Sequence, residues 1–515
     1  MPNLYWKNKD KFERSKTYKT QIFYPFQILE SISSPPINKF IPNSELIQKN
    51  TEIIQTPQFK VNDWENLLIW GDNKDVMNSL IKKFSNKIKI IYIDPPFATG
   101  GDFKFKTLIG ENDAFEINEA YSDAWKGGID EYIDFLYERL VVMKELLAED
   151  GSIYVHLDWH VSHYIKIVMD EIFGKENFRN EVIWAYPAAS MRTRRFFIRS
   201  FDSILFYTKS SEYTFNDDPG IYMEYSDRVK FALKEDDKGI FYYRGGSHNG
   251  KKLSQKVYVT NKGIFPRDVW TDIPYIRANT LEYQGFSTQK PERLLRRIIL
   301  ASSNETDIVA DFFCGSGTTL AVAEKLGRRW IGSDMTKHAI NISRKRILDI
   351  YNSNDIINWE KKYKKNPNSF KILSVNKNLQ DINTYDKFLV NNIQKGKKKT
   401  LFQDVKFEIK ILKDNNNISI ELIDYFVPNL DLVENKLKRK IQSFSDWIDS
   451  WTIDFISQNS YFNMMWISYR TPKNRKLDLT SDRYFYEKEG KYQISVKVID
   501  ILGNETSQEY EISIE

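Results

Sequence analysis

Residues 308–319 have the sequence IVADFFCGSGTT, and this stretch decides the fold. Its apolar start predicts a short buried strand, and a helical pattern opens at Thr318, so Gly315 and Gly317 lie in the turn between strand and helix. An acid, Asp334, follows about 20 residues later, the spacing at which a carboxylate meets ribose hydroxyls in nucleotide-binding sheets. We therefore predict a nucleotide-binding α/β sheet.

The glycine pair alone is weak evidence, because ordinary turns contain such pairs often. The third glycine of a Rossmann dehydrogenase is missing. No Gly-Lys-Ser/Thr sequence follows either, which excludes an ATP-binding P-loop at this turn. The predicted ligand is a nucleoside that carries something other than a pyrophosphate.

A strand–helix rhythm extends outward from this stretch on both sides and predicts a parallel sheet. Short apolar runs predict strands, and apolar residues at helical spacing predict helices. The predicted strands are residues 66–70, 87–94, 151–157, 308–312 and 330–333, and the predicted helices are residues 74–84, 132–147, 291–301 and 318–326. The rhythm breaks between residues 187 and 287, which predicts an insert within the α/β domain. Beyond residue 352, alternating apolar and polar residues predict a separate β-rich domain, with Gly503-Asn504 as a turn between its last two strands.

Composition narrows the class of protein. The chain has 515 residues, 75 Lys plus Arg against 70 Asp plus Glu, and a formal net charge of +5, which is only a weak indication of a polyanionic partner. The single cysteine, Cys314, excludes an intramolecular disulfide and a multi-cysteine zinc site, and with five His we expect no metal. We expect a cytoplasmic protein, because the N-terminus has no apolar signal region and no run of about 18 apolar residues occurs.

A second motif, Asp94-Pro95-Pro96-Phe97, directly follows a predicted strand. The two prolines give a rigid turn at the carboxyl edge of the sheet, where ligands bind. Asp94 and the carbonyl of Pro95 can both accept hydrogen bonds from one NH₂ group, and Phe97 offers a flat face to a planar base. The motif therefore suits the exocyclic amine of an extruded nucleobase, although a strand end with an ordinary loop would also explain it.

Together these motifs resemble those of the DNA amino-methyltransferases, which use S-adenosylmethionine. The order, with the DPPF motif first, then the insert and then the glycine motif, is similar to the β class, which includes type III modification subunits and solitary methylases. Thr288-Gln-Lys-Pro291 resembles the segment that holds the methionine end of the cofactor, and Gly71-Asp72-Asn73 the segment that meets its adenine. The resemblance implies a Rossmann-like methyltransferase sheet over roughly residues 66–350.

The resemblance assigns residues to roles. The implied catalytic residues are Asp94, Pro95, Pro96 and Phe97. The implied cofactor-binding residues are Asp72, Thr288, Lys290, Pro291, Asp311, Phe313, Gly315, Gly317, Thr318 and Asp334. The implied division is a lead-in (1–60), a catalytic half (61–186), a target-recognition insert (187–287), a cofactor half (288–351) and a β-rich accessory domain (352–515).

Two positions depart from the usual motifs. Phe312 stands where the family usually has Pro, and we expect it to lie inward on its strand. Phe97 stands where Tyr is more frequent, which keeps the stacking face and removes a hydroxyl. Asp at position 94 favours transfer to N6 of adenine. N4 of cytosine, a DNA-recognition subunit without activity, and methylation of RNA or protein remain as alternatives.

Basic and aromatic residues are interleaved in the insert, and the resemblance implies that the insert contacts double-stranded DNA. The expected DNA-binding residues are Arg192, Arg194, Arg195, Arg199, Lys251 and Lys252, with a solvated basic face as the alternative. In the accessory domain, we expect three tryptophans in the core: Trp447, Trp451 and Trp466. We expect residues 436–440 to lie on a solvated helix face. This large extra domain favours a partner, such as a restriction or helicase–nuclease subunit, and the resemblance also makes a homodimer plausible.

Overall fold

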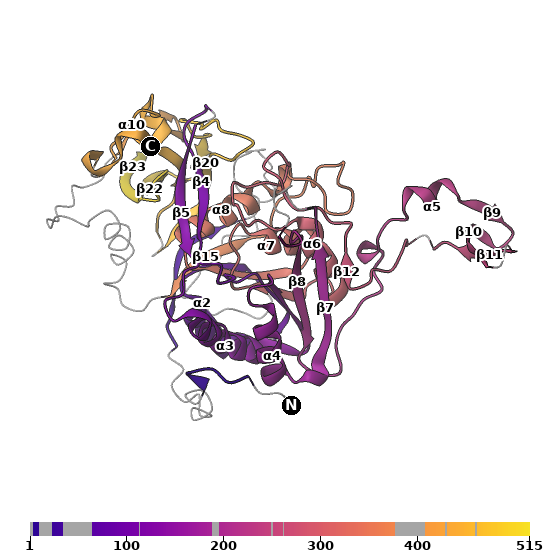
Figure 1. Cartoon of the computed structure of the whole chain (residues 1–515). Helices are drawn as coiled ribbons and strands as arrows, with labels where there is room; N and C mark the ends of the chain where they lie inside the picture. Colours follow the sequence, from indigo (N-terminus) through magenta and orange to yellow (C-terminus); the bar gives the residue numbers. More distant parts are fainter. Residues whose placement is uncertain are drawn as a thin grey trace.

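The protein is described by a computed structural model that covers residues 4–9, 23–33, 64–112, 114–187, 195–248, 251–260, 262–375, 407–427, 430–458 and 461–515. A large mixed sheet with helices on both faces forms the body, and smaller antiparallel sheets lie at the C-terminal end (Figure 1). None of the helices in these ranges has the length and apolarity that crossing a bilayer requires.

Six parallel strands form the centre of the large sheet, in the order β6-β3-β13-β14-β2-β15. Their bounds are β2 (Asn66–Trp70), β3 (Ile88–Ile93), β6 (Leu147–Leu157), β13 (Ile308–Asp311), β14 (Arg329–Asp334) and β15 (Phe370–Val375). Strands β3 and β13 are buried along their whole length. Both faces of a parallel sheet are covered by helices, which explains why these strands consist almost entirely of apolar residues. The predicted α/β sheet is confirmed.

Two groups of three helices cover the two faces. Helices α2 (Asn73–Phe84), α3 (Gly128–Leu146) and α4 (Ser162–Phe173) share a core with Ile91 and Ile93 of β3. Helices α6 (Glu292–Ser302), α7 (Thr318–Lys325) and α8 (Lys337–Leu348) share the other core with Ile90 and Tyr92. Successive side chains of β3 therefore point to opposite faces, and the strand anchors both helical layers (Figure 1).

The order of the strands creates a crevice between β3 and β13. From β3 the chain continues outward to β6, whereas from β13 it continues in the opposite direction to β14. The loops after β3 and β13 therefore diverge, and such a switch point at the carboxyl ends of the strands is where open α/β sheets bind ligands. Both sequence motifs lie in these two loops.

The large sheet extends beyond the predicted limits of the core. Strand β1 (Phe26–Ile32), from the predicted lead-in, pairs antiparallel with β15 and parallel with β19 (Phe462–Met464). Strand β8 (Phe201–Thr208), within the predicted insert, pairs antiparallel with β6 and with β7 (Phe178–Ala185), and β12 (Val269–Trp270) forms the edge. Antiparallel neighbours need no helical crossover, so the strand–helix rhythm gave no sign of β1 and β8.

Two β-hairpins project from the body. The first consists of β4 (Asp102–Leu108) and β5 (Phe115–Ser122), follows the DPPF motif and was not predicted. The second lies in an arm that extends away from the body (Figure 1) and contains α5 (Asp227–Phe231), β9 (Lys234–Asp236), β10 (Gly239–His248) and β11 (Lys251–Tyr258).

The C-terminal part is β-rich, as predicted. One sheet contains β16 (Phe407–Asp414), β17 (Asn417–Tyr425) and β21 (Tyr484–Phe485); the other contains β18 (Ile448–Asp454), β20 (Trp466–Tyr469), β22 (Gly490–Asp500) and β23 (Glu505–Ile514). Trp447, Trp451 and Trp466 lie in their shared core, which confirms the prediction for these residues. Gly503 has a φ of +85° in the predicted turn between β22 and β23.

Candidate active site

A cavity of about 210 Å³ opens at the crevice between β3 and β13. Loops that follow β2, β3, β13 and β14 contribute to its walls. Of the implied site residues, those that line it are Asp72, Asp94, Pro96, Thr288, Lys290, Asp311, Phe313, Gly315, Thr318 and Asp334. Pro95, Phe97, Pro291 and Gly317 are not among the lining residues, although each is next to one that is. The structure thus brings four separate sequence motifs to one cavity.

Asp94 and Lys290 form an ion pair at the cavity. Lys290 Nζ lies 2.6 Å from Asp94 Oδ2, and both side chains are largely buried. The other carboxylate oxygen, Asp94 Oδ1, is buried and has no hydrogen-bond partner among the described residues. A buried carboxylate oxygen without a donor is unfavourable, so this atom is suited to accept a hydrogen bond from a ligand.

A buried polar network lies beneath Phe97. The ring of Phe97 stacks on His156, with ring centroids 6.3 Å apart. His156 Nε2 donates a hydrogen bond to Asp202 (3.0 Å), and His156 Nδ1 shares one with the Tyr92 hydroxyl (2.9 Å). Tyr186 donates to the same carboxylate. Burial opposes ionisation of Asp202, but the hydrogen bond and charge of His156 outweigh it and hold the pKa of Asp202 below its usual value. The network thereby fixes the plane of the Phe97 ring.

Asp123 holds the DPPF loop, which we define as residues 94–99. Its fully buried carboxylate accepts the N–H of Ala98 (3.0 Å), the N–H of Thr99 (2.8 Å) and the hydroxyl of Thr99 (2.9 Å). Ala98 has a φ of +54°, an unfavourable conformation for a residue with a side chain. The indole of Trp125, which lines the cavity, also donates to Asp123. Asp123 therefore stabilises a strained turn beside Phe97.

The glycine loop, residues 311–319, adopts the predicted turn. Gly315 and Gly317 have φ values of +48° and +73°, and a Cβ atom on Gly317 would come within 2.7 Å of Ser343 Oγ. That hydroxyl donates to the carbonyl oxygen of Gly315 at 3.0 Å. Cys314 is buried, and Phe312 is fully buried, as its position on the strand suggested.

Two carboxylates sit at the ends of β13 and β14. Burial raises the pKa of Asp311 from 3.8 to about 7, although hydrogen bonds from Thr319 and from the Phe313 N–H oppose the shift. Burial also raises the pKa of Asp334, which accepts the Gly315 N–H at 3.1 Å. Each carboxylate oxygen has more than one lone pair, so both carboxylates can still accept hydrogen bonds from a ligand.

Asp72 lies at the end of β2 as the N-cap of α2. It accepts the Lys74 N–H at 2.8 Å and pairs with Arg139 at 3.1 Å. Arg139 also donates to Asn73, whose amide donates to the carbonyl oxygen of Phe312. These bonds fix the β2 loop against the glycine loop.

Several cavity residues were not predicted from the sequence. Among the unpredicted lining residues are Asn73, Trp125, Phe135, Arg139, Phe286 and Gln289. Asn73 stands in the recognised Gly-Asp-Asn motif and could have been included. Gln289 likewise stands in the recognised Thr-Gln-Lys-Pro segment. The other four come from helices and loops that carry no local motif. Asp123 and His156, outside the lining, were missed for the same reason.

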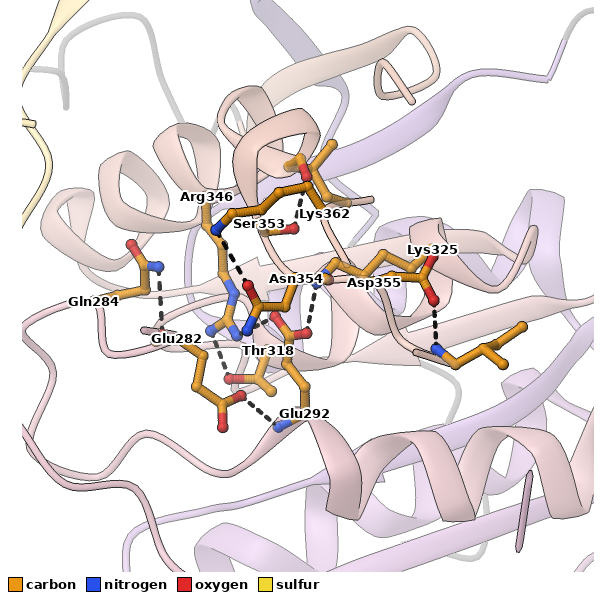
Figure 2. Close-up of polar contacts among 12 residues, drawn as sticks. Glu282, Gln284, Glu292, Thr318, Lys325, Arg346, Ser353, Asn354, Asp355 and Lys362 are labelled. Carbon is orange, nitrogen blue, oxygen red and sulfur yellow. Dashed lines mark hydrogen bonds and ion pairs between the residues drawn. The ribbon is translucent and has the colours of Figure 1, made fainter. Parts of the chain in front are cut away.

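A buried ionic cluster contacts Thr318 at the end of the glycine loop (Figure 2). Glu292 at the start of α6 lies 2.6 Å from Lys325 Nζ and 2.9 Å from Arg346 Nη2. Arg346 also donates to Thr318 Oγ1 at 2.8 Å. Burial, and then the charge of Glu292, raise the pKa of nearby Glu282 to about 7. The cluster ties α6, α7 and α8 together at the turn that carries Thr318.

The β4–β5 hairpin connects the cavity with the C-terminal part. Phe105 forms an isolated antiparallel bridge with Phe286, a cavity residue. On the other strand, Lys440 Nζ donates to the Phe115 carbonyl oxygen at 2.7 Å and pairs with Glu116 at 2.6 Å. Lys440 thus contacts the hairpin instead of lying on the solvated face predicted for residues 436–440.

The expected DNA-binding residues are distributed over two regions. Arg195 and Arg199 are exposed in the loop that joins β7 to β8. Lys251 and Lys252 belong to β11 on the projecting arm. Arg192 and Arg194 lie outside the described residues. The four described residues therefore lie in two separate regions. In the described part of the chain, no three His, Cys, Asp or Glu side chains are grouped as metal ligands.

Comparison with known proteins agrees with these motifs. The sequence model of the N6/N4 DNA methylase family matches residues 88–345, half of the chain. The chain is similar to the type II methyltransferase M.EcaI of Enterobacter cloacae, with 31% identity over 331 residues that cover 55% of this chain and 69% of that protein. It is 30% identical over 274 residues to the DNA adenine methyltransferase YhdJ of Escherichia coli, covering 53% of this chain and 80% of that protein. It is 26% identical over 412 residues to the probable type III restriction-modification enzyme HindVI Mod subunit of Haemophilus influenzae, covering 58% of this chain but about half, 52%, of that subunit.

Proposed function

The chain belongs to the N6/N4 DNA methylase family, and from this premise we propose that it transfers a methyl group from S-adenosylmethionine to N6 of adenine at a specific site in double-stranded DNA. Asp94 at the first position of the DPPF motif favours adenine, and so does the similarity to YhdJ, a DNA adenine methyltransferase. Transfer to N4 of cytosine is the alternative.

The observation that carries the proposal is the buried Asp94 Oδ1 at the cavity, which has no partner among the described residues. Phe97 is close by, because Lys290 Nζ, the ion-pair partner of Asp94, lies 5.5 Å from the centre of its ring. An exocyclic NH₂ group would supply the missing donor, and the planar base would stack on Phe97. A carbonyl group at the same position on the base has no hydrogen to donate, so its oxygen and the Asp94 carboxylate would be two acceptors that face each other. The site thus discriminates in favour of bases that carry an amine.

The described cavity residues fit the cofactor of the family. Four carboxylates (Asp72, Asp94, Asp311 and Asp334) line the cavity, against two cationic side chains (Arg139 and Lys290). This excess of carboxylates suits a ligand with a positive charge and with hydroxyl donors. Aromatic walls suit the adenine ring of such a ligand, and the implied holding residues are those of the glycine loop, the β2 loop and the TQKP segment.

In the proposed reaction, bound S-adenosylmethionine supplies an electrophilic methyl group. Asp94 Oδ1 accepts one N–H of the target amine, the Pro95 carbonyl accepts the other, and together they orient the nitrogen lone pair. Lys290 holds Asp94 Oδ2, which fixes the carboxylate in place. Asp94 Oδ1 is also positioned to take the proton that the amine loses. Positioning and electrostatics supply the rate enhancement, without a covalent enzyme intermediate.

We place this activity in a restriction-modification or defence system. The similarity to a type III Mod subunit supports this placement. The β-rich C-terminal part would offer a surface to a restriction or helicase–nuclease subunit, and self-association is compatible with the same proposal.

Modified-base sequencing of DNA from cells that express this chain tests the proposal. We expect N6-methyladenine at one sequence motif with the wild type and with Asp482→Ala, a control at an exposed carboxylate of the C-terminal part. We expect none with Asp94→Ala. N4-methylcytosine would replace the proposed base, and no modification by the wild type would contradict the proposed activity.

A further inference from the structure

We propose that the loop formed by residues 195–200 enters the DNA duplex at the target base, and that Phe197 is the wedge that separates the base pair. The inference rests on the proposed function and assigns to this loop a role in extruding the base. It is independent of the residues that hold the cofactor or the amine.

The β-sheet places this loop at the same edge as the DPPF loop. β3 and β6 are parallel, with Ile93 beside Val155, and Leu157 of β6 pairs with Ser203 of β8. β8 runs antiparallel to β6, so the residues that precede β8 emerge where β3 and β6 end. Asp202, at the start of β8, lies 3.0 Å from His156, the residue on which Phe97 stacks.

The loop exposes its large apolar side chains. Phe197 is 98% exposed and Phe196 51%, and Ile198 and Phe201 are also exposed. Trp159, just beyond the end of β6, is 40% exposed. A cluster of exposed aromatic side chains is unfavourable in water and marks an interaction surface. Nothing in the described part of the chain covers Phe197.

The charges of the loop commit this surface to nucleic acid. Residues 195–200 have the sequence RFFIRS, with two arginines and no carboxylate. The guanidinium of Arg199 lies 3.7 Å from the centre of the Trp159 ring and 5.4 Å from that of Phe196, which orders these side chains into one stack. Arginine contacts phosphates, and apolar side chains enter the base stack, so the combination suits a duplex that is being opened.

Extrusion of a base requires its pair and its stacking contacts to be broken. Phe197 inserted at that step would replace the stacking that the remaining bases lose. Its contribution should therefore be large when the target base is paired and small when the base is already unpaired. A side chain that contributes only to general DNA binding would show no such difference.

The test compares Phe197→Ala with Phe231→Ala. Phe231 is a suitable control because it is 90% exposed and lies in α5 on the projecting arm. Each variant is assayed for methyl transfer on two duplexes with the recognition sequence: one fully paired, the other with an abasic site opposite the target base. A third duplex carries 2-aminopurine at the target position, so that its fluorescence reports unstacking without turnover.

We expect Phe197→Ala to lose about 5- to 150-fold in transfer to the paired duplex, the range that loss of one base–aromatic stack gives. The loss should be within about twofold on the abasic duplex, and the 2-aminopurine signal should fall. Any loss with Phe231→Ala should be equal on both duplexes. An equal loss on both duplexes, or no loss, for Phe197→Ala would overturn the inference. If the wild type methylates neither duplex, the proposed function itself fails, which this comparison separates from a failure of the wedge.

Discussion

Asp123 provides the sharpest test of how the active site is organised. Asp123→Ala removes the acceptor of two backbone N–H groups and one hydroxyl in the DPPF loop, at 2.8–3.0 Å. It also removes the acceptor of the Trp125 indole N–H at 3.0 Å. Asp123 lies outside the large sheet, in the segment between β5 and α3. We therefore expect Asp123→Ala to leave the protein folded and to slow methyl transfer.

The magnitude follows from these contacts. Each hydrogen bond to a charged acceptor contributes about 1.5–3 kcal/mol. Water reaches the exposed Thr99 and recovers part of this loss, and Ala98 relaxes from a left-handed conformation that costs about 1–2 kcal/mol. A net loss of about 2–4 kcal/mol for the ordered loop corresponds to a decrease of about 30- to 1000-fold in transfer rate.

Single-turnover methyl transfer measures this loss directly, with cofactor affinity and thermal unfolding measured alongside. Asp123→Asn keeps one acceptor oxygen but turns an NH₂ group toward Thr99, so its loss should be intermediate. Asp482→Ala should behave as the wild type. A wild-type transfer rate in folded Asp123→Ala would refute the assigned role of this carboxylate, and a loss confined to cofactor affinity would assign it to the cofactor site instead.

Three further predictions concern the cofactor cavity. Gly317→Ala should lower the melting temperature and weaken cofactor binding at least about tenfold. The reason is that a φ of +73° at this position costs about 1–2 kcal/mol for Ala and that the added Cβ approaches Ser343. Adding Ser343→Gly to this variant should recover only part of the lost affinity, as measured by calorimetry. Burial raises the pKa of Asp311 to about 7, and a cation binds the ionised carboxylate better. The affinity for S-adenosylmethionine should therefore rise as the pH increases through 7. The rise should be smaller for S-adenosylhomocysteine, which lacks the sulfonium charge, and it should be absent in Asp311→Asn. Lys440→Glu should weaken cofactor binding by up to about fivefold by repelling Glu116 of the hairpin beside the cavity, and the double reversal with Glu116→Lys should restore it; an additive loss in the double variant would contradict a contact between the two.

Local sequence patterns predicted the parts of the structure that local physics determines. Apolar runs and two glycines predicted the strands and helices around residues 308–334. The strand before the DPPF motif predicted that this motif lies at the carboxyl edge of the sheet. Parallel strands buried on both faces and helices with one apolar face leave clear patterns, and carboxyl ends of parallel strands meet at one edge. These rules suffice to bring Asp94, Asp311 and Asp334 to one cavity.

The parts that were missed depend on contacts between distant segments. Strands β1 and β8 join the large sheet through antiparallel pairing, which needs no helix and leaves no rhythm. Asp123 and His156 act through partners tens of residues away. Lys440 was predicted to be part of a solvated basic run, because its ion pair with Glu116 of the hairpin depends on the tertiary fold. Such roles follow from the tertiary fold, which a single sequence does not display.

The most direct test of the central claim is transfer of a labelled methyl group by the purified chain. The chain is incubated with methyl-labelled S-adenosylmethionine and double-stranded DNA that contains the recognition sequence, and the DNA is digested to nucleosides. We predict label in N6-methyl-2′-deoxyadenosine for the wild type, and none for Asp94→Ala although that variant still binds the cofactor. Equal labelling by wild type and Asp94→Ala, or no labelled nucleoside with a wild type that binds both cofactor and DNA, would contradict the account.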